Sequence, residues 1–363
     1  MPGQDRYARA YAPGRVELLG NHTDYNEGVV LAAAIDRGLT VSGNAREDGV
    51  ISIMSTTMGL VEIARAELQP RTGEQRWANY VLGVANELSA RGIPVSGFSA
   101  EVDGDLPSGN GLSSSAALAV ATAFFLLKLY ERELPRLDIA KICRMAEHRF
   151  AGVQSGLLDQ VTSIFGKADY AVFFDARTEE VRTIPFPTNL SLLIAETGAQ
   201  RELVTGKYND RRDETRAAAQ TLNVRALRDI SLAQLTERSD LAPLLRRRAT
   251  HVVAENDRVW RAAELLERGD GFGFGKLMNE SHESSRTNFE NSSPALDLLV
   301  DLARGFPDVL GSRLTGGGFG GATVTLCERA QTKNIAQKLG AAYAEKTGIN
   351  PRIFVCQVSS GAR

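Results

Sequence analysis

The chain has 363 residues, of which 43% are hydrophobic and 24% are charged. This composition is typical of a soluble globular protein, and the length suits two middling domains or one large α+β unit with a cleft. The formal net charge of −2 argues against nucleic-acid binding through a basic surplus. No apolar run reaches the roughly 18 residues that span a bilayer, and the first residues lack the apolar core of an export signal. We therefore expect a cytoplasmic protein without a membrane or nucleic-acid partner.

Three cysteines stand far apart in the sequence, at Cys143, Cys327 and Cys356, and none belongs to a Cys-x-x-Cys pair. An odd number at this spacing predicts reduced, buried thiols and not a disulfide framework or a zinc site. The four histidines are scattered as well. A metal site built on His and Cys is therefore not expected.

Alternating apolar and polar residues predict strands within residues 27–63, joined by turns that contain Gly and Asp. Apolar spacing of three and four predicts a helix over 77–91. A strand that runs into a loop follows at 98–107. A long, mostly apolar helix is expected over 112–133; Lys128 interrupts it, which favours a helix buried on most sides over a membrane span.

A further helix is expected near 138–150, followed by a loop over 151–160. Two strands follow, near 168–176 and 191–197. Residues 202–290 are expected to be largely helical, with charged outer faces.

The last part of the chain, residues 312–360, predicts a strand, a helix and a strand. We place a domain boundary near 180–200. The two predicted domains are residues 1–190 and 191–363.

A loop rich in glycine and serine precedes the long apolar helix. Glycines remove side chains from a turn, so that backbone N–H groups can converge on one oxyanion. The serines then open a helix whose first N–H groups and dipole favour negative charge. The alternative is a flexible turn in which a serine caps the helix. The predicted phosphate-binding residues are Pro107, Ser108, Gly109, Asn110, Gly111, Leu112, Ser113, Ser114, Ser115 and Ala116.

A second glycine cluster, with five glycines in the six residues 316–321, lies between two predicted strands. Each of these glycines loses conformational entropy on folding. A close backbone approach to a ligand or to another loop would explain the cluster, and so would a tight crossing between domains.

Two further segments carry polar groups suited to catalysis. Residues 14–26 place Arg15, His22 and Asp24 in a turn between apolar strands, where they could bind a polyhydroxylated ligand or form an Asx-rich turn. Asp159 follows a glycine in the predicted loop and could be a general base or a helix cap. Phosphoryl transfer needs basic groups, Mg²⁺ and a carboxylate near the attacking hydroxyl. Arg15, Asp159 and Glu147, together with the glycine-serine loop, would supply these parts.

Three segments, in this order, resemble the signature blocks of the GHMP kinase superfamily: GRVELLGNHTDYNEG, PSGNGLSSSAAL and LTGGGFGGATV. Within it, the first block resembles that of galactokinases, as do WANYVLGV, AEHRFAGVQSGLLDQ and MNESHESSRTNFENSSPALDLLV. The resemblance runs from about residue 11 to the C-terminus. It implies an α+β fold with a ribosomal-protein-S5-like N-terminal domain, a ferredoxin-like C-terminal domain and the active site between them.

The resemblance also implies transfer of the γ-phosphate of ATP, with Mg²⁺, to the anomeric hydroxyl of galactose or a similar sugar. Asp159 would be the catalytic carboxylate near the sugar O1, and Arg15 would neutralise charge between it and the γ-phosphate. Residues 107–116 would cradle the phosphates, with Ser115 and Glu147 as magnesium contacts. We expect a monomer or a weak homodimer. The expected sugar contacts are Glu17, Asn21, His22, Asp24, Gly156 and Tyr208, and the expected supporting glycines are Gly317 and Gly318.

The first block departs from the family pattern, which usually reads Gly-Arg-Val-Asn-Leu-Ile-Gly-Glu-His-Thr-Asp-Tyr-Asn. Glu17 stands in place of Asn, and Asn21 stands in place of the Glu that accepts a hydrogen bond from the C6 hydroxyl. An amide at position 21 could donate to a sugar carboxylate, whereas a carboxylate would repel it. One hypothesis is therefore a substrate altered at C6, such as galacturonate, or one that lacks C6, such as arabinose; N-acetylgalactosamine is a further alternative. The alternative is that Asn21 binds galactose through its amide oxygen.

A second departure lies before Asp159, where residues 153–156 read Val-Gln-Ser-Gly and the family usually has Val-Pro-Cys-Gly. We expect this change to reshape the sugar pocket. One rival function is a silent relative that senses sugar and ATP, although the catalytic candidates are all present. A second rival is a kinase of the same superfamily with another acceptor, such as mevalonate or homoserine; the HTDYN block and Tyr208 argue against it.

Overall fold

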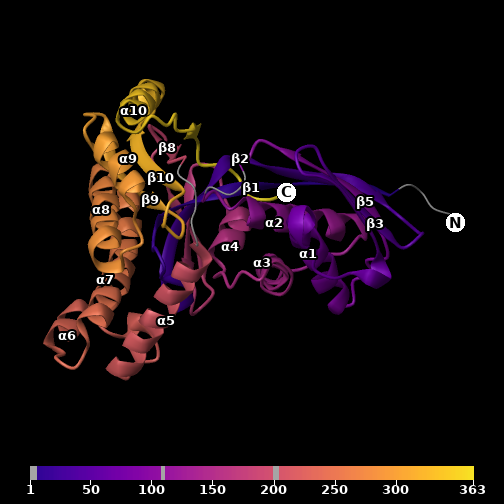
Figure 1. The fold of residues 1–363 in the computed structure, drawn as a ribbon, viewed down its shortest axis with the longest axis horizontal. Helices are drawn as coiled ribbons and strands as arrows, with labels where there is room; N and C mark the ends of the chain where they lie inside the picture. The colour runs from indigo at the N-terminus through magenta and orange to yellow at the C-terminus, as the bar shows by residue number, and fades with distance from the viewer. Residues whose placement is uncertain (1–5, 108–110, 199–203) are drawn as a thin grey trace.

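The computed structural model describes residues 6–107, 111–198 and 204–363 of the chain. Two sheets, each covered by helices, form an elongated molecule, with most of the N-terminal half at one end and the long C-terminal helices at the other (Figure 1). The α+β class expected from the sequence is confirmed.

The first sheet is long and mostly antiparallel, in the order β4-β3-β5-β2-β6-β7, with β1 paired to β2. Only β3 and β5 pair in parallel among its described strands. β1 and β2 are much longer than the others and carry the sheet into the middle of the molecule (Figure 1). The strands are β1 (Tyr7–Leu19), β2 (Val29–Ala45), β3 (Val50–Ser55), β4 (Gly59–Ala64), β5 (Phe98–Gly104), β6 (Tyr170–Asp175) and β7 (Val181–Pro185).

Four helices cover one face of this sheet. The long apolar helix α2 packs against β1 and β2 on one side and against the other three helices on the rest. Its residues from Ala116 to Ala123 are buried without a break, as its composition predicted. The four helices are α1 (Asn79–Ala90), α2 (Ser114–Leu129), α3 (Arg136–Ala146) and α4 (Leu158–Phe165).

The second sheet is antiparallel throughout, in the order β11-β8-β10-β9. One face packs on α9 and α10, through residues such as Leu193 and Leu339. Its strands are β8 (Leu190–Glu196), β9 (Val309–Thr315), β10 (Ala322–Glu328) and β11 (Ile353–Cys356). The helices of this half are α5 (Val204–Leu222), α6 (Leu232–Glu237), α7 (Pro243–Glu267), α8 (Gly271–Ser284), α9 (Pro294–Arg304) and α10 (Thr332–Thr347).

One apolar core joins the two halves. It packs Val16 and Leu18 of β1 and Leu31 of β2 against α7, α8 and the inner faces of β8 and β10. The chain also returns after β11, since Val358 bridges Ile35 and the final residue pairs with Tyr11. Contact of this extent holds the groups at the junction in fixed relative positions. The boundary between residues 1–190 and 191–363 stays a prediction.

One predicted loop is wrong in part. Residues 158–160 belong to α4, so Asp159 lies in the first turn of a helix and not in a loop. Leu158, Val161 and Ile164 recur at a spacing of three and pack into the core of the first half, which is the helical signal that the preceding glycine obscured.

The three cysteines are free and buried, as predicted. No helix in the described ranges has the length and apolarity needed to cross a membrane.

Candidate active site

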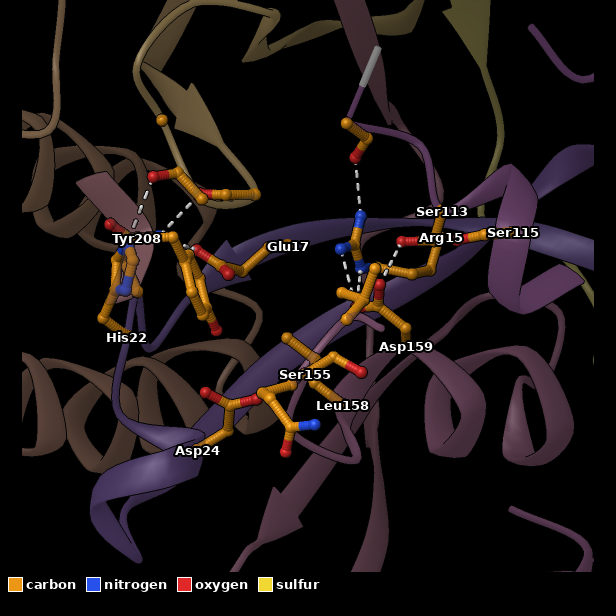
Figure 2. Close-up of a pocket in the computed structure, with 18 of the residues that line it drawn as sticks. Arg15, Glu17, His22, Asp24, Ser113, Ser115, Ser155, Leu158, Asp159 and Tyr208 are labelled. Carbon is orange, nitrogen blue, oxygen red and sulfur yellow. Dashed lines mark hydrogen bonds and ion pairs between the residues drawn. The ribbon is translucent and has the colours of Figure 1, made fainter. Parts of the chain in front are cut away.

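A cavity of about 320 Å³ opens at the junction of the two halves, within the range of small-molecule sites. Its walls come from β1 and the turn after it, the start of α2, the segment before α4, α5 and the 316–318 loop (Figure 2). The predicted residues that line it are Arg15, Glu17, Asn21, His22, Asp24, Gly111, Ser113, Ser114, Ser115, Gly156, Asp159, Tyr208, Gly317 and Gly318.

Some predicted residues do not line this cavity. The side chains of Leu112 and Ala116 are buried in the protein core, and Glu147 is buried behind the wall. Pro107 is half-buried outside the lining. The prediction for Ser108, Gly109 and Asn110 falls outside the described residues.

Asp159 is held by two side chains from different elements. Arg15 Nε and Nη2 lie 2.7 and 2.6 Å from Asp159 Oδ1. Ser113 Oγ donates to Oδ2 at 2.5 Å. Arg15 Nη1 also donates to the carbonyl oxygen of Gly111, at 2.6 Å, and so links the carboxylate to the glycine-serine loop (Figure 2). Each carboxylate oxygen thus has a donor that fixes its orientation.

The start of α2 faces this pair. Ser113 precedes the helix in the left-handed conformation, at φ 56°, and its hydroxyl does not cap the helix. Because that hydroxyl donates to Asp159 instead, the alternative of a serine N-cap is wrong for Ser113. The first N–H groups of α2 receive no bond from it and remain available to an anion.

Glu147 lies in the π-helical turn Glu147–Ala151 that follows α3. Its Oε2 accepts a hydrogen bond from Ser155 Oγ at 2.8 Å, whereas Oε1 is buried and has no partner among the described residues. Burial raises the pKa of this carboxyl to about 7, and the charge of Asp159 adds to the shift. Ser155, which stands where the family usually has Cys, therefore contacts Glu147. From the sequence we expected this change to affect the sugar pocket.

His22 presents a neutral ring. Burial lowers its pKa to about 3. Nε2 lies 3.1 Å from the carbonyl oxygen of Gly317 and Nδ1 lies 2.7 Å from the hydroxyl of Tyr25. A carbonyl can only accept, so Nε2 carries the proton and Nδ1 accepts from Tyr25. The ring is also packed against Tyr208, with centroids 5.0 Å apart.

Asp24 is a buried acid on the cavity wall. Burial raises its pKa from 3.8 to about 7, and the charge of Glu17 adds to the shift. Its Oδ1 accepts from the backbone N–H of the next residue, Tyr25, at 2.9 Å, so the carboxylate bonds the backbone locally but without the bond to the second residue on that defines an Asx turn. Its Oδ2 faces Gly156, where a Cβ atom would lie 1.7 Å away. A residue with a Cβ atom at that position would therefore displace the Asp24 carboxylate, and the backbone of Gly156 forms part of the wall.

Glu17 and Asn21, the two departures from the family pattern, contact each other. Asn21 Nδ2 donates to Glu17 Oε1 at 2.9 Å and to the carbonyl oxygen of Gly316 at 2.7 Å. Asn21 Oδ1 accepts from Asn291 at 2.7 Å. Glu17 Oε1 also forms an ion pair, at 3.1 Å, with the fully buried Arg313. Burial raises the pKa of Glu17 and Arg313 opposes the shift.

The glycine cluster packs on the turn after β1. Gly318 has φ +79°, and a Cβ atom there would lie 2.1 Å from the carbonyl oxygen of Asn291. The carbonyl groups of Gly316 and Gly317 accept from Asn21 and His22. Both alternatives for this cluster therefore hold in part, because the loop crosses between the halves and also lines the cavity.

The sequence did not point to Asn291 and Arg313 as parts of the site, and it linked Ser155 to the sugar pocket but not to Glu147. Asn291 lies after the π-helical turn Ser285–Phe289, and Arg313 lies on β9 before the glycine cluster. Asn291 stands within a segment that carries the family resemblance, and Arg313 directly precedes another, which was the available signal. A buried arginine in the apolar strand β9 calls for a carboxylate partner, but the sequence alone does not say which carboxylate.

Comparisons with known proteins show the class to which the fold belongs. The model of the GHMP kinases N terminal domain matches residues 79–167, and that of the GHMP kinases C terminal domain matches 262–345. A solved structure of a mevalonate kinase has a TM-score of 0.71 at 20% identity over 97% of this chain and 99% of that one, which supports the fold alone. The fold and the site thus define a GHMP kinase.

Within that class the matches are specific. The galactokinase galactose-binding signature matches residues 3–45. The chain is 40% identical to the galactokinase of Roseiflexus sp. (strain RS-1), covering 96% of this chain and 91% of that protein. It is 37% identical to that of Haemophilus influenzae (strain ATCC 51907 / DSM 11121 / KW20 / Rd), covering 97% and 94%. The crystal structure of Lactococcus lactis galactokinase complexed with galactose has a TM-score of 0.93 at 32% identity, covering 98% and 95%. The chain belongs to the galactokinase family.

Proposed function

We propose that the protein transfers the γ-phosphate of ATP to the anomeric hydroxyl of galactose. The observation that carries this proposal is the position of the Arg15–Asp159 ion pair, between the start of α2 and the polar turn with His22 and Asp24 (Figure 2). One side of the pair offers helix N–H groups to phosphate. The other side offers neutral and acidic groups to sugar hydroxyls.

In this proposal Asp159 orients the attacking hydroxyl and accepts its proton. Arg15 and Ser113 each donate to this carboxylate, so it is fixed before the sugar binds. Arg15 also reaches the carbonyl oxygen of Gly111, next to the phosphate loop, and there its charge can stabilise the transferring phosphoryl group. A base and a cation held at one point match what phosphoryl transfer requires.

The residues present fit a magnesium ion. Mg²⁺ binds through one or two carboxylates together with substrate phosphates, and the described residues contain no cluster of three His, Cys, Asp or Glu side chains. The buried Glu147 Oε1 accepts no hydrogen bond from the described residues, which supports Glu147 as the carboxylate, with Ser115 beside it. The ion would neutralise charge on the phosphates.

The contacts of Asn21 support galactose over galacturonate. Its two amide hydrogens already bind Glu17 and Gly316, so it has none left for a sugar carboxylate. The relatives named galactokinase support the same choice. Arabinose and N-acetylgalactosamine remain alternatives to test. The monomeric or weakly dimeric state and the cytoplasmic location remain predictions from the sequence.

The test is an assay of the purified protein with ATP and Mg²⁺ against galactose, galacturonate, N-acetylgalactosamine and arabinose. We expect ADP to form fastest with galactose, with the phosphate on O1, as ³¹P NMR can identify. ATP consumption that no sugar increases, despite measurable sugar binding, would instead indicate the silent sensor.

A further inference from the structure

The side chain of Asn21 lines the cavity wall but is fully buried, and its nitrogen and its oxygen both have protein partners. Its amide offers two hydrogens and one oxygen. The hydrogens bind Glu17 Oε1 and the carbonyl oxygen of Gly316, and the oxygen accepts from Asn291. A flipped amide would place its oxygen against two acceptors, which fixes the orientation. Asn21 therefore ties three segments together and has no hydrogen left to donate to a ligand.

Glu17 is in the opposite situation. Both of its contacts, to Asn21 and to Arg313, involve Oε1, and Oε2 has no partner among the described residues. The residue lines the cavity and is 5% exposed. Figure 2 shows its carboxylate between the Tyr208–His22 side of the cavity and Arg15.

The position of Glu17 on β1 sets its distance from Arg15 and Asp159, where we propose that the phosphoryl group is transferred. It lies two residues after Arg15, and both side chains line the cavity. Two residues of a strand span roughly 6.6 Å, which is about the length of one monosaccharide. A sugar with O1 at Asp159 would therefore bring a hydroxyl from its far side to Glu17.

We propose that Glu17 Oε2 is the specificity-determining acceptor of the sugar pocket, and that Asn21 and Arg313 are positioning residues that hold it. This inference rests on the proposed sugar kinase function. A carboxylate only accepts hydrogen bonds, so it selects sugars that present a neutral hydroxyl there. A uronate would place a second desolvated carboxylate against it and is excluded by like-charge repulsion.

The test compares kcat/KM for galactose, 6-deoxygalactose and galacturonate in the wild type and in Glu17→Gln. Loss of a charged acceptor weakens binding by about tenfold or more. We expect KM for galactose to rise by about that factor in the variant, and the preference for galactose over each of the other two sugars to fall by at least about tenfold. Glu101→Gln, an exposed change on β5, is the matched control and keeps both preferences.

Glu17→Gln leaves Arg313 without its ion-pair partner and can impair folding. The double variant Glu17→Gln/Arg313→Met removes both charges and gives the same readout; thermal unfolding and binding of an ATP analogue establish that each variant is folded. A folded variant with wild-type preferences overturns the inference, and so does a loss of preference in Asn21→Ala that Glu17→Gln lacks. A wild type inactive on every sugar would instead refute the proposed function.

Discussion

Arg15 on β1 and Asp159 on α4 are 144 positions apart in the sequence, yet their side chains form an ion pair of 2.6 Å on the cavity wall. The pair joins the sheet to the helical layer of the first half. It also lies between the start of α2 and the turn with His22 and Asp24 (Figure 2). The local packing of the site therefore depends on it, and so does the chemistry that we propose.

Asp159→Asn tests the catalytic role of this carboxylate. The amide is of equal size but accepts a proton poorly, so we expect kcat to fall by on the order of 10² to 10⁴. Sugar and ATP-analogue binding should change much less, as calorimetry can measure. Asp48→Asn, which alters a half-exposed aspartate in a distant turn, serves as the control and should retain wild-type turnover. Wild-type kcat in Asp159→Asn would contradict the assignment.

Ser113→Ala removes the donor to Asp159 Oδ2. A hydrogen bond to a charged group contributes about 1.5–3 kcal/mol, so kcat should fall by roughly tenfold or more. The effect acts through Asp159. In the Asp159→Asn background the same change should therefore have little effect, and a double-mutant cycle measures this coupling. Fully additive losses would show that Ser113 acts elsewhere.

Glu147→Gln tests the magnesium assignment. An amide is a weaker ligand for Mg²⁺ than a carboxylate, so the Mg²⁺ concentration for half-maximal activity should rise by about tenfold or more. A titration of activity with Mg²⁺ at saturating galactose measures it. Glu133→Gln, at an exposed position, is the control. An unchanged Mg²⁺ requirement in a folded Glu147→Gln protein would remove Glu147 from the metal site.

The raised pKa of Asp24 predicts a pH dependence of stability. The pKa is about 7 in the folded chain and 3.8 for the unperturbed group. The folded state binds this proton more tightly, so the stabilisation is complete below about pH 3.8 and is lost as the pH rises to about 7. Asp24→Asn removes this titration. Between pH 4.5 and 8 its free energy of unfolding, from urea denaturation, should therefore fall less than that of the wild type.

The expected difference is on the order of 2 to 4 kcal/mol. Parallel curves for the two proteins would refute a raised pKa of Asp24.

Gly318→Ala and Gly316→Ala separate a backbone clash from an unfavourable dihedral angle. Both glycines have positive φ, at +79° and +72°. A Cβ atom at Gly318 meets the carbonyl oxygen of Asn291 at 2.1 Å, whereas at Gly316 the nearest atom is 3.6 Å away. Gly316→Ala should lower the free energy of unfolding by about 1–2 kcal/mol, and Gly318→Ala by about 3 kcal/mol or more. Equal losses in thermal or urea unfolding would contradict the clash.

Much of the local structure follows from the sequence. The apolar spacing of residues 77–91 and 112–133 predicts α1 and α2, and alternation within 27–63 predicts β2 to β4, because these signals depend only on neighbouring residues. The start of α4 is harder to predict, since Gly156 favours a loop, whereas the burial of Leu158 and Val161 favours a helix.

The resemblance to galactokinases also pointed to residues that line the cavity, including Arg15, Asp159 and the turn with His22 and Asp24. It assigned a residue type to each place in the motif. It left open which hydrogen bonds each side chain makes, because those partners come from other segments.

The two departures show this limit most clearly. Read from the sequence, Glu17 and Asn21 are separate changes, and Asn21 has a free amide to offer a sugar. In the structure the two side chains bind each other. Asn21 is also bonded to Gly316 and Asn291, and Glu17 is held by Arg313. These three partners come from segments about 270 to 300 residues further along the chain. The sequence by itself determined the family, the elements and the chemical groups in the site. Only the tertiary structure decided which of those groups remain free for a ligand, because a buried polar group forms hydrogen bonds with the groups that the fold places next to it.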